Sequence, residues 1–438
     1  MIFWNCIMKD LVKVLISLIF LIKCLPCYSY SDKIYSSTQI IDDLNIMDSI
    51  IRTVHPNPFY YVDENKYIQK KEEIMHVVSQ FDSLSISEAY KNLAPFISIL
   101  RDGHSLLLMP SALILKEYNE KVFPIKIKII NGKVYAKYDF YKRRLFPEKT
   151  EILEINNFSI KELLKNLYEL YPVENSEEMF YTTIEKDFGA LLYCYLNLKE
   201  DLLLRMGNPR LDEYRTKLVS YSSIKNSFDV NGSKAYDFQL SETSDSAYIV
   251  LKNFLPIPQY YDFIHKSFRE IKNKGIKYLK IDVRGNKGGA SYAVDSLMAY
   301  ICNKPYRLYD SVFVRISKPV LTKLIEKKSE LINQIDTSSV DQILRLSPPY
   351  ISPSRNVDFY DGQLEVLIDK ETYSGASTFA NAVKVMDCGS VIGDSDAKNI
   401  YFGDFLFFQL PNTKMLFSVS TREFVEYSGT RKANRVGI

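Results

Sequence analysis

The second half of the chain alternates between short apolar stretches of strand length and longer stretches with helical spacing. From residue 235 onward we predict strands at 247–251, 278–283, 364–368 and 390–392, and helices at 260–273, 291–302 and 375–386. Because parallel strands need crossover helices, this order predicts an α/β domain over 235–438, with a mainly parallel sheet and helices on its faces. A hairpin around Pro411-Asn412 follows the last of these strands.

Residues 33–115 are predicted to form a helical domain. Apolar residues recur at helical spacing from Ile40 to Val54 and stop at His55-Pro56-Asn57-Pro58, where two prolines end the helix. A polar helix is expected from Asn65 to Gln80, and a third from Ser87, whose hydroxyl can cap it. The third helix runs out before residues 101–105 (Arg-Asp-Gly-His-Ser).

The next segment, 118–175, is predicted to be a small β-rich module. Two alternating runs flank Asn131-Gly132, which is the strongest short hairpin signal in the chain. A further strand at 152–155 leads into a helix that starts near Ser159. The stretch 176–230 is mixed, helical in its first part, and we assign it no arrangement.

The first 29 residues read as a secretory signal peptide. Lys9 and Lys13 precede the apolar run 14–22, and a breaker segment ends near Ser29. The apolar run is too short for a membrane span, so we expect export to the periplasm or the exterior. A lipid-modified Cys24 or Cys27 is the alternative, and only then would the protein be bound to a membrane.

The bulk composition is that of a globular protein. With 438 residues, two or three packed units are expected. Lys+Arg number 56 and Asp+Glu 53, so no basic excess suggests a nucleic-acid partner. Cysteines past the signal region are Cys194, Cys302 and Cys388; an odd number argues against a disulfide framework. None has a metal-ligand neighbour, and we expect no metal and no cofactor.

Two strand-to-helix junctions carry residues suited to chemistry. At the first, Gly288 and Gly289 open a helix, where backbone amides can hold an anion or an oxyanion; the alternative is a tight glycine turn without a ligand. At the second, Ser374 precedes Gly375, and the helix dipole favours negative charge on the serine oxygen or its adduct. The alternative is that Ser374 or Ser377 is merely an N-cap.

His104 is the best candidate for a base that activates a serine. Imidazole is the side chain suited to taking a proton at neutral pH, and the chain has four histidines. His76 and His265 lie in helical stretches with polar surroundings, and His55 precedes a proline turn. His104 lies in a loop that contains glycine.

In this order the segments resemble peptidase family S41, the C-terminal processing or tail-specific peptidases. Residues 102–105 (Asp-Gly-His-Ser) are similar to the family's Asp-Gly-His-Thr, and 282–289 (Asp-Val-Arg-Gly-Asn-Lys-Gly-Gly) to its Asp-Leu-Arg-x-Asn-x-Gly-Gly. Residues 372–376 and 391–394 resemble the nucleophile turn and the Val-Ile-Gly-Glu that follows it. The resemblance implies a crotonase- or ClpP-like α/β core, an N-terminal helical cap and a PDZ-like module, here reduced within 118–175.

The resemblance also implies roles for individual residues. Ser374 is the nucleophile, and the amides of Gly375 and of Gly288 or Gly289 form the oxyanion hole. One subgroup uses a lysine base, for which Lys398 is near the expected place, although its acidic, polar surroundings disfavour a neutral amine. The tricorn-like subgroup uses serine and histidine with a distant glutamate, and we favour it with His104 as base. Glu423 and Glu426 are the candidates for the glutamate.

These observations predict an exported serine peptidase that acts on polypeptides. The alternative is a non-catalytic protein that binds a ligand or peptide on the same scaffold. Acyl-CoA chemistry is suggested by fold analogy alone, and export from the compartment that holds CoA argues against it. The sequence makes no prediction of the oligomeric state.

Overall fold

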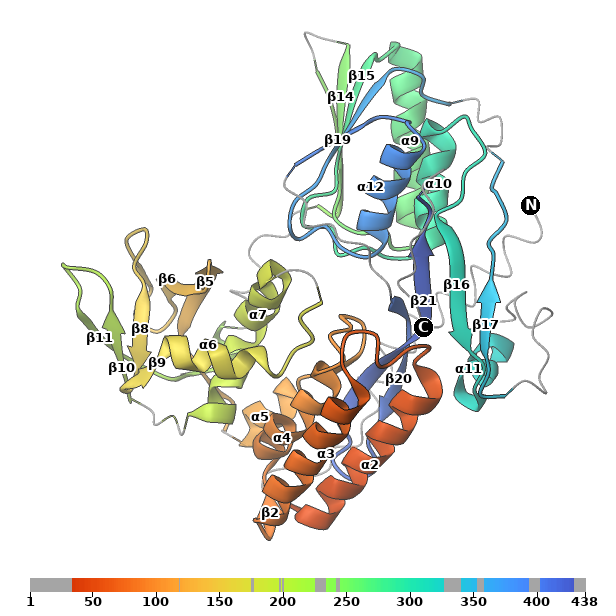
Figure 1. Cartoon of the computed structure of the whole chain (residues 1–438). Coiled ribbons are helices and arrows are strands. Elements are labelled where there is room, and N and C mark those ends of the chain that lie inside the picture. The colour runs from red at the N-terminus through yellow and green to blue at the C-terminus, as the bar shows by residue number, and fades with distance from the viewer. Residues whose placement is uncertain are drawn as a thin grey trace. The chain divides into compact units, whose positions relative to one another are not determined.

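A computed structural model describes residues 34–117, 119–174, 177–196, 198, 201–224, 234–241, 245–326, 340–352, 358–393 and 402–428 (Figure 1). The predicted signal peptide, with Cys24 and Cys27, and the alternative base Lys398 lie outside these residues. Across the described segments, we find no helix with the length and apolar character needed to cross a membrane.

The N-terminal part contains the three predicted helices, α2 (Ser37–Val54), α3 (Glu64–Ser79) and α4 (Ile86–Ser98). The predicted cap of α4 was wrong. Ser85, not Ser87, caps it, because the Ser85 side chain accepts from the Glu88 amide while the Glu88 side chain accepts from the Ser85 amide. The Ser87 hydroxyl instead donates to Glu117 at the end of α5 (Ser111–Glu117). Two short strands, β1 (Tyr35–Ser36) and β2 (Ser83–Leu84), pair beside these helices.

The β-rich segment contains the predicted hairpin. Strands β5 (Ile125–Ile130) and β6 (Lys133–Asp139) join through Asn131 and Gly132, whose φ angles of 50° and 72° fit a two-residue turn of the type that matches strand twist. The short strands β4 (Lys121–Val122) and β7 (Arg144–Leu145) lie on either side of it in sequence.

A second sheet extends this segment past the predicted boundary at residue 175. It has the order β11-β10-β8-β9, from the strands β8 (Ile152–Ile155), β9 (Phe158–Ser159), β10 (Asp201–Met206) and β11 (Glu213–Lys217). Between its halves run α6 (Ile160–Tyr168) and α7 (Glu177–Tyr195). Strand β12 (Val219–Ser220), which pairs with β4, and the single turn α8 (Tyr221–Ile224) follow.

The α/β part has the predicted parallel sheet. Its order is β13-β14-β15-β18-β19, from the strands β13 (Tyr236–Leu240), β14 (Ser246–Leu251), β15 (Tyr278–Asp282), β18 (Gln363–Leu367) and β19 (Ser390–Ile392); only β13 is antiparallel to its neighbour.

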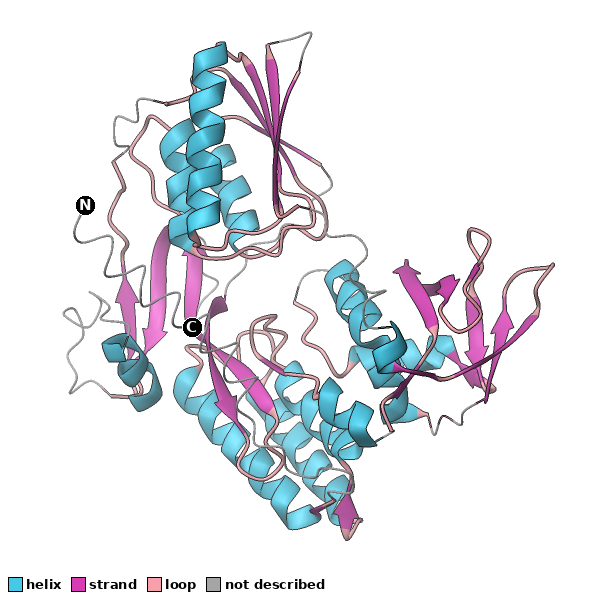
Figure 2. Ribbon diagram, turned by 180° about the vertical axis from the view of Figure 1, so that it is seen from behind, coloured by secondary structure: helices cyan, strands magenta, loops and turns pink. Residues whose placement is uncertain are grey.

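The helices α9 (Pro258–Lys274), α10 (Ser291–Ile301) and α12 (Gly375–Val385) lie on the same face of that sheet, rather than on both faces as predicted (Figure 2). The parallel strands follow one another across the sheet in chain order. Successive right-handed crossovers then all fall on one side.

A separate antiparallel sheet combines strands from the C-terminal part of the chain with one short strand from the N-terminal part. It contains β17 (Ile343–Leu346), β16 (Tyr309–Arg315), β21 (Leu416–Glu426) and β20 (Phe402–Gln409), in that order, with α11 (Lys318–Glu326) between β16 and β17 in sequence. Strand β3 (Leu106–Leu107), directly after His104, pairs with β21.

Because of this sheet, residues predicted as one C-terminal domain divide between two hydrophobic cores. Val314, Phe417 and Phe424 share a core with the N-terminal helices, whereas Ile281, Val366 and Phe379 belong to the core of the parallel sheet.

Candidate active site

The two predicted junctions meet at one edge of the parallel sheet. Strands β15 and β18 are parallel neighbours with Asp282 opposite Leu367, so the segments that follow them start side by side. The Thr372 hydroxyl donates to the Val283 carbonyl at 3.1 Å, and the Tyr373 amide donates to the Asn286 carbonyl at 2.9 Å. These bonds hold the serine turn against the glycine loop.

Ser374 has a backbone that L-residues rarely adopt. Its φ is 51° and its ψ −127°, at the junction where α12 begins. Although Ser374 occupies the N-cap position, its side chain makes no capping hydrogen bond. Ser377 lies inside the helix and donates to the Thr372 carbonyl. The N-cap alternative therefore does not explain Ser374, and a strained turn that leaves a serine hydroxyl free is the arrangement of nucleophile elbows.

The glycine pair packs directly on this turn. A side chain at Gly288 would bring its Cβ within 2.6 Å of Ser374 Cβ and of the Gly375 nitrogen. The Gly288 amide donates to Asn286 Oδ1 at 2.7 Å, so it is already occupied. Gly289 and Gly375 touch through their backbones, and within the described residues neither amide donates a hydrogen bond. Of the amides predicted for an oxyanion hole, those of Gly289 and Gly375 are available.

His104 is placed by the antiparallel sheet. His104 lies in the loop just before β3, and the pairing of β3 with β21 fixes this loop. The Ser418 hydroxyl also donates to the His104 carbonyl at 2.8 Å. Its ring lies between those of Tyr373 and Phe405, at centroid distances of 5.2 and 5.9 Å, and its side chain is 12% exposed. Burial lowers the pKa of His104, against the opposing charges of Asp102 and Asp404. A neutral imidazole can accept a proton, as a base requires.

Asp102 is a buried anion beside His104. It accepts hydrogen bonds from the His104 amide, from Ser105 and from His55 Nε2. His55 Nδ1 accepts from the Asn57 amide, which leaves the proton on Nε2. Burial alone would raise the pKa of Asp102, but the hydrogen bonds and the charges of His55 and His104 hold it below its usual value. Asp102 thus supplies a fixed negative charge near the imidazole.

The predicted glutamates, Glu423 and Glu426, both lie on β21. Glu423 is buried and accepts from Asn57 Nδ2 at 3.5 Å. Burial raises the pKa of Glu426 to about 7. The charges that act on the imidazole are those of Asp102 and Asp404. A carboxylate that the sequence did not suggest, Glu174, approaches instead through the Tyr373 hydroxyl.

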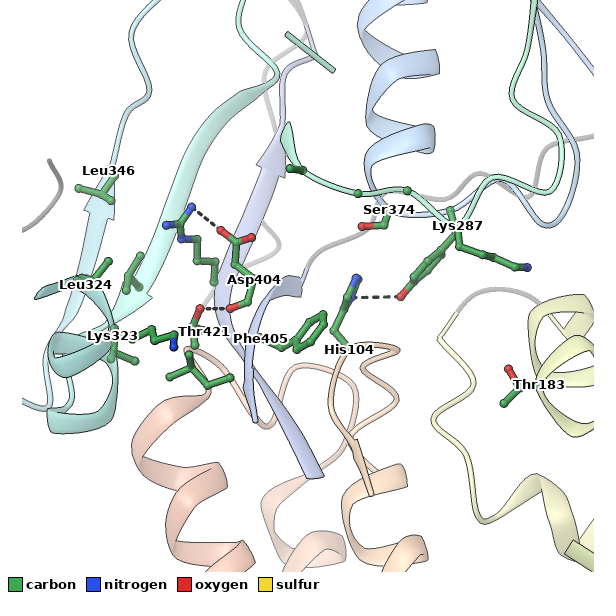
Figure 3. A pocket seen from close by; sticks show the side chains of 18 residues that line it. His104, Thr183, Lys287, Lys323, Leu324, Leu346, Ser374, Asp404, Phe405 and Thr421 are labelled. Atoms are coloured by element: carbon green, nitrogen blue, oxygen red, sulfur yellow. Dashed lines mark hydrogen bonds and ion pairs between the residues drawn. The ribbon is translucent and has the colours of Figure 1, made fainter. Parts of the chain in front are cut away.

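Ser374, His104 and both glycines line a single cavity of about 810 Å³ (Figure 3). In the part of the chain that the structure describes, no hydrogen bond joins Ser374 to His104. Such contacts are often long without substrate. Away from Ser374 the cavity has an apolar wall, formed by Val314, Val320, Leu324, Leu346 and Leu406. The rim carries charges, among them Lys323, Asp404 and Arg422.

One cluster of side chains has donor atoms close enough together to bind a metal ion. The donor atoms lie within 4.8 Å of one another and belong to Asp102, His104 and Glu174. Each already has hydrogen-bond partners, because Asp102 accepts three bonds and Glu174 accepts from Tyr373 and from the Gly103 amide. A metal ion would have to displace these bonds. These hydrogen bonds therefore account for the short distances between the three side chains.

The comparison with known families agrees with the resemblance seen in the sequence. Residues 245–438 match the sequence profile of peptidase family S41. The matched residues include both strand-turn-helix junctions described above. No curated protein sequence is similar enough to the chain to count as a match.

Solved structures share the fold over most of the chain. Mature CPAF is 14% identical, with a TM-score of 0.62 and coverage of 90% of each chain. CPAF complexed with lactacystin is 15% identical, with a TM-score of 0.62 and coverage of 90% of this chain and 91% of that one. The photosystem II D1 C-terminal processing protease is 13% identical, covers 90% and 89%, and has a TM-score of 0.44. The TM-scores of 0.62 show that the chain shares its fold with CPAF.

Proposed function

We propose that this protein is a serine peptidase in which Ser374 is the nucleophile and His104 the general base. The observation that carries the proposal is the turn at Ser374. It holds a serine in a strained backbone, at the start of a helix, with its hydroxyl uncapped and facing the cavity that His104 also lines. Strain of this kind persists only where the surrounding structure enforces it, and it clusters at functional sites.

The geometry supports acyl transfer in two steps. His104 takes the proton of the Ser374 hydroxyl while the serine oxygen attacks the peptide carbonyl, and the amides of Gly289 and Gly375 stabilise the oxyanion. The imidazolium then gives its proton to the leaving amine, which leaves an acyl-serine. Water, activated by the same imidazole, hydrolyses the acyl-serine and regenerates the hydroxyl. The negative charge of Asp102 stabilises the imidazolium between these transfers.

The cavity favours a polypeptide substrate with a large apolar side chain near the cleaved bond. Its wall is built from aliphatic side chains of β16, β17, β20 and α11, which line the same cavity as the serine. Burying one Leu or Phe side chain there contributes about 1.5–3 kcal/mol. A peptide backbone can run past Gly288 and Gly289, where no side chain obstructs it.

The proposal also includes the type of core, the helical cap, the PDZ-like module and the export predicted from the sequence. The core is of the crotonase or ClpP type, helices α2–α4 form its cap, and the β-rich segment is a reduced PDZ-like module. The signal-like first 29 residues support export, with a lipid anchor at Cys24 or Cys27 as the alternative. Cell fractionation, N-terminal sequencing and labelling with a fatty-acid analogue separate these outcomes.

Turnover of a casein-type substrate tests the peptidase. Wild type should cleave it, Ser374→Ala should not, and Ser296→Ala, which removes a hydroxyl bonded within helix α10, should cleave at nearly the wild-type rate. The second candidate is a protein that binds peptides without cleaving them, and the lack of a hydrogen bond between Ser374 and His104 in the described structure favours it. Wild type that binds such a substrate without turnover would establish that candidate.

A further inference from the structure

We propose that Tyr373 and Glu174 position His104 as the base, through a hydrogen-bonded relay from the imidazole to the tyrosine hydroxyl to the carboxylate. The inference rests on the proposed peptidase function. In serine–histidine sites a carboxylate usually bonds directly to the histidine. Here the proposal gives that place to Tyr373, which is adjacent to the nucleophile and donates to Glu174, from the segment between α6 and α7.

The direction of the relay follows from donor and acceptor chemistry. Glu174 Oε2 lies 2.6 Å from the Tyr373 hydroxyl, and a carboxylate can only accept, so the tyrosine donates its one proton there. His104 Nδ1 lies 3.3 Å from the same hydroxyl. The tyrosine oxygen can then only accept from this nitrogen. The proton is thereby held on Nδ1, and Nε2 keeps the lone pair that serine activation needs.

The surroundings are built to hold this hydroxyl. Tyr373 is 8% exposed, and both its burial and the charge of Glu174 raise its pKa well above the usual value, so it keeps its proton. The Gly103 amide donates to Glu174 Oε2 at 3.1 Å. A Cβ on Gly103 would lie 2.8 Å from that carboxylate oxygen and closer still to the tyrosine hydroxyl. The glycine between Asp102 and His104 leaves the space that the relay occupies.

Asp102 does not replace the relay. Its Oδ1 lies 3.9 Å from His104 Nδ1, beyond hydrogen-bond distance, and it accepts from the His104 amide instead. Asp404, on β20, acts on the imidazole through charge alone. Among the residues that the structure describes, Tyr373 is the group that bonds to His104 Nδ1. Asp102 and Asp404 stabilise the imidazolium, and Tyr373 with Glu174 fixes the tautomer and the ring orientation.

The proposed site extends beyond the residues that match the family profile. Residues 245–438 contain the serine and both glycines, whereas His104 and Glu174 both lie before them. Orientation of the base then depends on how the segment that contains Glu174 packs on the loop at Gly103.

Two substitutions test the relay with different expected signatures. Tyr373→Phe removes only the hydroxyl. Glu174→Gln reverses the relay, because the amide can donate to the tyrosine, which then donates to Nδ1 and drives the proton to Nε2. Both should lower kcat by about 10²–10⁴-fold with little change in KM. Tyr360→Phe is the matched control; it removes a buried hydroxyl that donates to backbone carbonyls elsewhere in the α/β core, and it should keep wild-type kcat.

The pH profile separates positioning from simple packing. Neutralising Glu174 removes a negative charge that stabilises the imidazolium, on a ring also faced by Asp102 and Asp404. The pKa of His104 should then fall, and the acid limb of kcat/KM should move to lower pH while its plateau drops. A packing defect would lower the plateau without moving the limb.

Nitrogen-15 NMR of labelled histidine reads the tautomer directly, whether or not the protein is active. With four histidines, the His104 signals can be assigned by substitution. Wild type should carry the proton on Nδ1, Tyr373→Phe should lose this preference, and Glu174→Gln should move it to Nε2. Wild-type tautomers in both variants, or turnover that neither variant slows, would overturn the relay. Absence of turnover in wild type would count against the peptidase proposal and leave the tautomer test decisive for the relay.

Discussion

Substituting Gly103 by alanine should impair catalysis through Tyr373. The added Cβ would lie 2.3 Å from the tyrosine oxygen and 2.8 Å from Glu174 Oε2. An ordinary contact begins near 3.4 Å, so the hydroxyl has to retreat by about 1 Å. The 3.3 Å contact with His104 is already long, and we expect this movement to break it. A displacement of about 1 Å can cost about 10²-fold in rate, and we expect a loss of that size in kcat.

The assay is steady-state hydrolysis, together with thermal unfolding of each variant. Gly189→Ala is the control, because its Cβ would meet nothing nearer than 3.6 Å and alanine favours the helix α7 in which it lies. Its kcat should equal that of wild type. The double variant Gly103→Ala/Tyr373→Phe should recover part of the thermal stability, since the tyrosine oxygen is gone while Glu174 Oε2 remains, but not the rate. A fully active Gly103→Ala would refute the reasoning.

Three further predictions concern stability and specificity. Because the pKa of Glu426 is raised, the wild-type protein should lose stability as the pH rises from about 4.5 to 7. Glu426→Gln should remove this loss of unfolding free energy, which is at most about 3 kcal/mol, when urea unfolding at pH 5 and at pH 8 is compared. Asp43, fully buried, accepts from the amides of Asn412 and Thr413 at 2.9 and 2.8 Å; Asp43→Ala should cost about 3 kcal/mol in urea unfolding, and Asp43→Asn less. Leu346→Asp should lower kcat/KM about 10-fold for peptides with a large apolar residue at the cleaved bond, while labelling by a small fluorophosphonate stays at the wild-type rate.

Local features of this fold could be predicted because each depends on residues close in sequence. The turn at Asn131-Gly132 follows from backbone preference, and the alternation of strands and helices after residue 235 follows from apolar spacing. The capping box at Ser85 and Glu88 was also readable, since serine and glutamate stand three residues apart before an apolar run. Choosing Ser87 overlooked that pair.

Features that depend on packing across the chain were not predictable. The antiparallel sheet brings β3 to β21 across more than three hundred residues and so carries His104 to the serine turn. Glu174 reaches Gly103 and Tyr373 from a segment whose local pattern shows only a loop between helices. Hydrogen bonds of this kind depend on tertiary structure, and a single sequence has no periodicity that marks them.

The sequence indicated Ser374 and His104, which line one cavity, but not the tyrosine that we propose orients the histidine. A glutamate late in the chain was expected from the resemblance, and Glu423 and Glu426 were the candidates. Both lie on β21, where Glu423 accepts from Asn57 Nδ2 and Glu426 is buried. A tyrosine next to the nucleophile reads in sequence as one more aromatic residue. Its role emerges only from the positions of Gly103 and Glu174.

The most direct measurement of the central claim is covalent labelling with a fluorophosphonate, followed by mass spectrometry of the labelled peptide. The adduct should lie on Ser374 in wild type, be absent from Ser374→Ala, and form much more slowly in His104→Ala. Label on another residue, or label that persists in Ser374→Ala, would contradict the assignment of Ser374 as the nucleophile.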